Sequence, residues 1–255
     1  MASGAEPPLV PVLPSSNRVR IASYNIRNGR RWRLESALRA MEQMDVGLGF
    51  LLEAKITDGA YTRFSSDYHV VATDAPSPHQ GGIALFYKDS RRWHIESVRR
   101  HGSNVISCVL VTGTRRFGLV GAYVPPSDRT TLGFVEAALD RLPPDCTPVV
   151  LGDLNVDLDD LRDDRDHEIA TALTTRNFED LLGHFRQRHR YRHCQTWSQT
   201  RNGEYISSRC DYILCPDRQF FLNTALRSPR LFDSDYLLIL ADLSLLPLDQ
   251  HRAYT

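Results

Sequence analysis

The chain has 255 residues and a formal net charge of zero, and 42% of its residues are hydrophobic. A chain of this length can bury one sizeable core, and its composition does not require a second domain. The five cysteines include no Cys-x-x-Cys pair, which argues against a disulfide framework or a zinc module. We therefore expect a reduced, intracellular protein, nuclear or cytoplasmic and not secreted.

The two ends of the chain differ from its middle in composition. The first residues, MASGAEPPLVPVLPSSN, are rich in Pro and Ser and lack the basic and apolar regions of a signal peptide. No apolar stretch approaches the roughly 18 residues that a membrane span needs. We expect a flexible lead over residues 1–17, one folded domain over 18–246, a tail over 247–255, and no association with a membrane.

Strand-like and helical patterns follow one another through the predicted domain. Apolar alternation and short apolar runs predict strands over residues 18–26, 46–54, 68–74, 81–88, 94–100, 104–113, 116–124, 146–156, 194–200, 210–215 and 237–246. Helical spacing of apolar residues predicts helices over 30–44, 130–142 and 167–182. The pair Gly81–Gly82 indicates a turn or a close approach of two backbones. This pattern favours an α/β fold in which helices flank two packed sheets, rather than a doubly wound parallel sheet.

Six short polar motifs lie mostly at the ends of these predicted strands. They are Asn25 in SYNIRNG, Glu53 in LLEAK, Tyr123 in AYVPP, Asp153 with Asn155 in LGDLNVD, Asp211 in SSRCDYIL and Asp235 in FDSDY. Strand ends are rigid and face loops, so catalytic groups are common there. Carboxylates and amides that converge with no Lys among them indicate a divalent metal ion and a phosphate ester substrate.

In this order, the six motifs resemble the endonuclease/exonuclease/phosphatase family over residues 18–246. That family includes apurinic endonucleases, DNase I-like nucleases, inositol phosphatases and the endonuclease domains of non-LTR retrotransposons. The segment QTWSQTRNGEYISSRCDYIL is most similar to the retrotransposon members. The resemblance implies a DNase I-like α/β fold, a four-layer α-β-β-α sandwich of two mixed, mostly antiparallel sheets.

The resemblance implies that Glu53, Asn25 and Asp235 form a site for Mg²⁺ or Mn²⁺. A carboxylate buried alone at the end of an apolar strand is costly, and a hard cation would relieve that cost at Glu53. Asn25 is the expected neighbour that orients this carboxylate. The alternatives are an exposed Glu53 at its strand end and an Asn25 that caps a turn.

Four further residues match the parts of the family that carry out hydrolysis. Asp153 would orient or deprotonate the attacking water, and Asn155 would donate a hydrogen bond to the phosphate. These two side chains point the same way if the backbone stays extended. Tyr123 would place its hydroxyl on a phosphate oxygen, although a packed loop residue is an equal alternative. Asp211 would orient a catalytic histidine.

The chain departs from the family at Tyr236, which stands where the family has that histidine. A phenol has a pKa near 10 and cannot carry positive charge at neutral pH, but it can donate one hydrogen bond. Losing one preorganised donor costs roughly 10²–10³ in rate. We therefore expect a weakened enzyme. Compensation by His79, beside the Gly81–Gly82 pair, is a second interpretation.

The segment HFRQRHRYRH, residues 184–193, combines arginines with aromatic residues, as nucleic-acid contacts do. The predicted DNA-binding residues are Arg186, Arg188, Arg190, Arg192, Trp197 and Arg209. A solvated basic helix end is the alternative for this segment. The acidic run within residues 155–166 would repel a phosphate backbone, and it is better interpreted as a solvated loop before a helix.

These observations predict a metal-dependent phosphodiesterase that nicks DNA, as retrotransposon endonucleases do, and is weakened by Tyr236. We expect a monomer, with DNA and a reverse transcriptase encoded by the same element as its partners. Two alternatives stay open at this point: an inactive nucleic-acid-binding remnant of the same fold, and a phosphatase that acts on small molecules.

Overall fold

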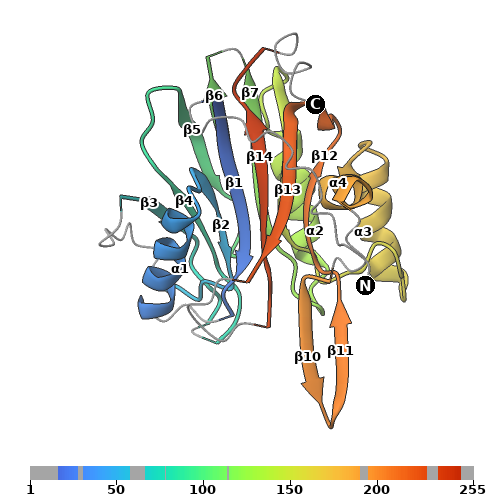
Figure 1. Ribbon diagram of the computed structural model, residues 1–255. Helices are drawn as coiled ribbons and strands as arrows, with labels where there is room; N and C mark the ends of the chain where they lie inside the picture. Colours follow the sequence, from blue (N-terminus) through green and yellow to red (C-terminus); the bar gives the residue numbers. More distant parts are fainter. Residues whose placement is uncertain are drawn as a thin grey trace, which may run out of the picture.

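Two six-stranded sheets pack face to face in the computed structural model, and helices cover their outer sides (Figure 1). The structure describes residues 17–27, 31–57, 67–77, 79–113, 115–189, 195–228 and 235–247. This is the four-layer α-β-β-α sandwich that the sequence predicts. The predicted domain boundaries, residues 18 and 246, remain predictions, since the lead and most of the tail lie outside these ranges.

The first sheet is antiparallel except for one parallel pair. Its order is β13 (Phe221–Arg227), β14 (Leu238–Ser244), β1 (Arg18–Asn25), β2 (Leu48–Leu52), β4 (Ile83–Tyr87) and β3 (His69–Ala72). Strands β1 and β2 are the parallel pair. Helix α1 (Arg31–Gln43) connects them and packs on the outer face through apolar residues that include Leu34, Leu38 and Met41.

The second sheet repeats this arrangement. Its order is β5 (Trp93–Arg100), β6 (Val105–Thr112), β7 (Arg116–Tyr123), β8 (Cys146–Asp153), β12 (Asp211–Cys215) and β9 (Glu179–Asp180), and β7 and β8 are parallel. Helices α2 (Thr130–Asp140) and α3 (Asp164–Thr174) cover its outer face through residues such as Val135 and Ile169. Helix α4 (Leu181–His189) and a short 3₁₀ helix (Arg218–Phe220) pack instead against the core between the sheets, through Leu181, Phe185 and Phe220.

A separate two-stranded hairpin, β10 (Trp197–Arg201) and β11 (Glu204–Ser208), extends away from both sheets (Figure 1). Among the helices that the structure describes, none is both long and apolar enough to cross a membrane.

One predicted helix, over residues 167–182, is wrong in its extent. The structure divides it into α3 and α4, with Glu179–Asp180 between them paired to β12. Two features end α3 at Thr174. The hydroxyls of Thr174 and Thr175 bond back to carbonyls within the last turn, and Asn177 takes a left-handed conformation with a φ of 57°.

The two sheets are tightly packed where a glycine of one sheet faces an aromatic ring of the other. A Cβ on Gly121 of β7 would lie 2.2 Å from the Phe50 ring of β2, so the inner layer has no space for one more methyl group there. A Cβ on Gly133, exposed on α2, would meet nothing within 4 Å.

We expect Gly121→Ala to lower the free energy of unfolding by about 1–3 kcal/mol, because it overpacks the interface between the sheets. The matched substitution Gly133→Ala should raise it by up to about 1 kcal/mol through helix propensity. Urea unfolding of both variants measures the difference. Equal effects at the two positions would contradict the packing described above.

Candidate active site

The parallel pairs bring the predicted site residues together at one edge of the sandwich. Tyr123 and Asp153 are register partners at the ends of β7 and β8, and Asp211 pairs with Asp153 from β12. Asn25 ends β1, and Glu53 directly follows β2, its parallel neighbour. A cleft of about 550 Å³ opens there, lined by Arg27, Glu53, Lys55, Tyr123, Pro126, Asn155, Trp197, Gln199, Ser208, Cys210, Asp235 and Tyr236.

Asn25 connects the carboxylates of the two sheets. It is fully buried, and its Nδ2 donates to Glu53 Oε1 at 3.0 Å and to Asp153 Oδ2 at 2.9 Å. Its Oδ1 accepts the backbone N–H of Arg27 at 2.9 Å. The amide therefore presents its donor to the carboxylates, as expected of an orienting neighbour. Its oxygen, the atom that would bind a metal, is used by the backbone.

The loop that carries Glu53 is held by the Gly81–Gly82 pair, where the sequence predicts a turn or a close approach. Gly81 and Gly82 accept hydrogen bonds from the backbone N–H groups of Lys55 and Ala54 at 3.1 and 3.0 Å. A Cβ on Gly82 would lie 3.0 Å from the Lys55 nitrogen, and Gly82 has a φ of 83°. Glu53 itself is left-handed, with a φ of 52°, so this contact holds the loop in a strained conformation.

Two cations that the sequence prediction missed lie among the carboxylates. Lys55 Nζ is 3.1 Å from Glu53 Oε2 and also donates to the Arg27 carbonyl. Arg27 Nη1 is 2.7 Å from Asp235 Oδ2. The expectation that no Lys belongs to the cluster is therefore wrong. Each cation follows a site residue by two positions, Asn25 or Glu53, and this spacing is the signal that identifies them.

Asp153 forms the floor of the site. It is fully buried, and burial raises its pKa to about 7, although hydrogen bonds from Asn25 and from the backbone N–H of Asn155 offset part of the rise. The backbone does not stay extended beyond it. Asn155 is left-handed, with a φ of 48°, and its N–H turns back to Asp153 Oδ1 at 2.9 Å. Its side chain lines the cleft and donates one N–H to the Val124 carbonyl at 3.0 Å.

Tyr123 lines the cleft from the end of β7, and its hydroxyl is hydrogen-bonded to Glu53. Burial, followed by the charges of Glu53 and Asp153, raises the pKa of Tyr123. The phenol therefore stays neutral at physiological pH and can act only as a hydrogen-bond donor or acceptor.

Asp211 is the residue that the resemblance pairs with a histidine, and Tyr236 stands at that histidine's position in this chain. It is fully buried, and neither carboxylate oxygen has a hydrogen bond of good geometry within the described ranges. Burial and the neighbouring Asp153 raise its pKa well above the usual range. The Tyr236 hydroxyl instead donates to Asp153, and burial raises the pKa of this phenol.

The base of the hairpin positions Asp235 and Tyr236. Asp235 O accepts from Ser198 N at 2.9 Å, and Leu237 N donates to Thr196 O at 2.7 Å. Trp197 Nε1 donates to Asp235 Oδ2 at 3.0 Å, whereas Asp235 Oδ1 is buried with no hydrogen-bond partner in the described part of the chain. One free carboxylate oxygen thus remains near the cleft.

The predicted DNA-binding residues fall into three groups. Trp197 lines the cleft. Arg209 is buried away from it, paired with Asp159 at 3.2 Å and with Asp180. The side chains of Arg186 and Arg188, and all of Arg190 and Arg192, lie outside what the structure describes. His79 is exposed and does not line the cleft, so its position does not favour compensation for Tyr236.

The donor set at the cleft fits a hard divalent cation held by few protein ligands. Within the described ranges, no group of three or more His, Cys, Asp or Glu side chains is placed to hold a metal ion. Mg²⁺ often takes only one or two carboxylates and completes its shell with water and phosphate oxygens. Glu53 and the free oxygen of Asp235 meet that requirement.

The sequence matches the Endonuclease/Exonuclease/phosphatase family over residues 22–235, most of the chain. The chain belongs to this family. None of the curated protein sequences matches it.

Solved structures with the same fold share few of its residues. The endonuclease domain of TRAS1, a telomere-specific non-LTR retrotransposon, aligns with a TM-score of 0.67 at 14% identity, over 88% of this chain and 98% of the domain. An AP endonuclease from Leishmania major aligns with a TM-score of 0.68 at 18% identity, over 92% of this chain and 90% of the endonuclease. A 3′ phosphatase from Neisseria, bound to a product DNA hairpin, aligns with a TM-score of 0.63 at 16% identity, over 89% of this chain and 99% of the phosphatase.

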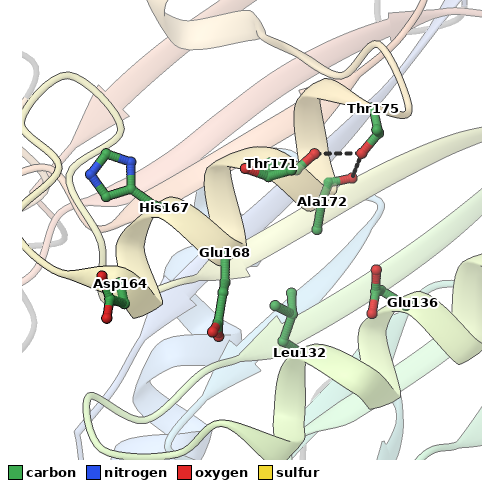
Figure 2. A pocket seen from close by; sticks show the side chains of 8 residues that line it. All are labelled: Leu132, Glu136, Asp164, His167, Glu168, Thr171, Ala172 and Thr175. Carbon is green, nitrogen blue, oxygen red and sulfur yellow. Dashed lines mark hydrogen bonds between the residues drawn. The ribbon is translucent and has the colours of Figure 1, made fainter.

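A second hollow, of about 800 Å³, lies between α2 and α3 on the outer side of the second sheet (Figure 2). Its lining is formed by Leu132, Glu136, Asp164, His167, Glu168, Thr171, Ala172 and Thr175. It contains none of the predicted site residues, and its acidic side chains make it a poor site for phosphate.

The buried Asp211 should make the protein less stable as pH rises. Its raised pKa means that only the unfolded chain loses this proton once the pH passes about 4, so stability falls until the folded-state pKa is passed. We expect Asp211→Asn to reduce this slope, leaving the part that the raised pKa of Asp153 contributes, and to raise the free energy of unfolding at pH 8 by about 1 kcal/mol or more. Denaturant unfolding from pH 4 to 8 measures both effects.

The control is Asp74→Asn, which changes an exposed carboxylate. It should reproduce the wild-type pH profile. A variant at position 211 that is as pH-dependent as wild type, or less stable at pH 8, would show that the carboxyl is not an uncompensated buried acid.

Proposed function

We propose that this protein is a metal-dependent phosphodiesterase that nicks DNA. The observation that carries the proposal is the joint placement of Asp153 and Glu53, which one amide of Asn25 holds at the floor of a cleft lined by hydroxyl, amide and cationic groups. Membership of a family of nucleases and phosphatases supports hydrolysis of a phosphate ester.

In this mechanism Asp153 accepts the proton of the attacking water. A pKa of about 7 suits a base that must be unprotonated before attack and must take a proton during it. The second N–H of Asn155, whose side chain lines the cleft, can donate to a phosphate oxygen. The Tyr123 hydroxyl can do the same only by exchanging its hydrogen bond to Glu53 for one to phosphate. Lys55 and Arg27 add positive charge there. Glu53 and Asp235 would hold Mg²⁺ or Mn²⁺, which would stabilise charge on the phosphate.

Tyr236 should weaken this chemistry. The family's histidine can carry positive charge beside the phosphate, whereas the Tyr236 phenol is neutral and its hydrogen bond is used by Asp153. Asp211 is left with no side chain to orient. This same observation favours the second candidate function, an inactive nucleic-acid-binding remnant of the fold.

The hairpin favours DNA over a small phosphate ester. Strands β10 and β11 project from the rim of the cleft, to which they contribute Trp197, Gln199 and Ser208 (Figure 1). Near the hairpin's tip, Tyr205 is 71% exposed and Ile206 is 43% exposed. A two-stranded ribbon fits a DNA groove, and exposed aromatic and apolar side chains can contact bases. Retrotransposon origin, a reverse transcriptase partner and a monomeric state belong to the same proposal.

We expect the protein to convert supercoiled plasmid to the nicked form with Mg²⁺ or Mn²⁺, and EDTA should stop the reaction. Asp153→Asn should abolish nicking because it removes the base. Tyr236→His should raise the rate by roughly 10²–10³, because it restores a preorganised and chargeable donor. Gel assays of initial rates measure all three effects.

Two results would decide between the candidate functions. If only Tyr236→His nicks, the natural chain is the binding remnant. If neither protein nicks and both hydrolyse a soluble phosphate monoester, the small-molecule phosphatase is correct and the DNA proposal is wrong.

The hairpin should contribute to DNA affinity separately from chemistry. We expect the double substitution Tyr205→Ser and Ile206→Ser to weaken binding of a duplex by about 1–3 kcal/mol, the usual range for loss of base contacts. Fluorescence anisotropy at fixed salt measures the change. Phe134→Ser, which changes an exposed aromatic residue on α2, is the matched control and should leave affinity unchanged.

A further inference from the structure

The acidic run that the sequence places in a solvated loop contains one buried cation. Arg165 is in the first turn of α3 and is only 7% exposed. Its nearest carboxylate is that of Asp166, with Oδ1 3.5 Å from Nη1. A buried guanidinium needs good acceptors for its N–H groups, and a single distant carboxylate does not supply them.

Backbone carbonyls supply acceptors for both terminal nitrogens, Nη1 and Nη2, while Nε has no hydrogen-bond partner within the described ranges. Arg165 Nη1 donates to Asn155 O at 3.0 Å. Nη2 lies within hydrogen-bonding distance of Leu154 O at 3.1 Å, Pro125 O at 3.2 Å and Val124 O at 3.4 Å. One side chain therefore contacts both loops that leave the parallel pair β7 and β8, the loops that follow Tyr123 and Asp153.

These loops have few other connections to each other. The backbone contributes one hydrogen bond between them, from Val124 N to Asp153 O at 2.8 Å, and the Asn155 side chain contributes a second, to Val124 O. Asn155 is also left-handed, a conformation that costs of order 1 kcal/mol and persists only where surrounding contacts hold it. The Asn155 carbonyl, on the strained peptide, is one of the acceptors of Arg165.

We propose that Arg165 is a positioning residue for hydrolysis. Its planar guanidinium fixes the loops 124–126 and 154–156 against each other, and so sets the direction in which the Asn155 amide enters the cleft. Arg165 does not line the cleft, so it acts through Asn155 and not on substrate. The catalytic part of this role rests on the proposed function, but the structural part does not.

A lysine at position 165 cannot reproduce the contacts that the guanidinium makes with the two loops. A single ammonium has three donors and no rigid fork, so it can reach some of the four carbonyls but cannot hold both loops in one geometry. Arg165→Lys therefore tests geometry with the charge retained, and Arg165→Met tests loss of both. Arg176→Met is the control, since Arg176 follows the same helix and pairs only with the surface residue Asp140, at 3.0 Å.

The first measurement is amide hydrogen exchange followed by mass spectrometry. Pro125 and Pro126 have no amide hydrogen, so Val124 reports for the first loop and residues 154–156 report for the second. In Arg165→Met, these amides should exchange at least about tenfold faster, while the rest of β7 and β8 keeps the wild-type rate. Arg165→Lys should be intermediate, and Arg176→Met should match wild type. Unchanged exchange in the two loops of a folded variant would overturn the proposal. If Arg165→Met does not fold, Arg165→Lys decides the question.

The second measurement is steady-state nicking, in the Tyr236→His background if the natural chain is too slow. The kcat of Arg165→Lys should fall by about tenfold to a hundredfold, with KM within about twofold, because misplacing a catalytic group affects the transition state more than substrate binding. A change confined to KM would refute the role. If no protein nicks, including Tyr236→His, the proposed function fails, and hydrogen exchange alone decides whether Arg165 holds the loops.

Discussion

One amide, that of Asn25, joins the two halves of the site. Glu53 belongs to the first sheet and Asp153 to the second, and two like charges brought together out of water repel each other. The Asn25 Nδ2 donates to both carboxylates, which makes their proximity tolerable, and its own orientation is fixed by the backbone of Arg27. This contact links the two packed sheets at the site. The cleft, the strained loops and the cations Lys55 and Arg27 lie around it.

The site lowers the stability of the fold that carries it. Asp153 and Asp211 are fully buried on adjacent strands, and burial raises the pKa of both. Most buried carboxylates in proteins are paired with a cation, and within the described ranges neither of these two acids forms an ion pair, so they do not contribute to stability as charged groups. Three apolar clusters, one between the sheets and one under each helical layer, supply the compensating stability.

The sequence was sufficient to predict the sandwich and the convergence of its strand ends. The strand period places Asn25, Glu53, Tyr123 and Asp153 at or next to strand ends, which is a local property. The parallel pairing that brings those ends to one edge comes from the structure. The conformations of the loops, by contrast, depend on residues that are distant in the sequence. Nothing in LGDLNVD alone shows that Asn155 turns left-handed, since that depends on acceptors and donors far along the chain, such as Arg165. The partner of Arg27, Asp235, is also distant, 208 residues along the chain, whereas Lys55 pairs with Glu53 only two residues before it and could have been predicted from the sequence.

Tyr236 changes the electrostatics of the site more than its shape. A histidine there could share a proton with Asp211 and carry positive charge toward the cleft, so that two buried acids would face one cation. The phenol donates to Asp153 instead, which relieves the acid that is already held by Asn25, while among the described residues Asp211 has Thr196 as its only side-chain hydrogen-bonding neighbour and no cation. The remaining cations, Lys55 and Arg27, are each paired with a carboxylate at the cleft. In the proposed reaction, substrate phosphate would therefore compete with Glu53 and Asp235 for positive charge, and a divalent metal ion would be more important to this chain than to a member of the family with histidine at this position.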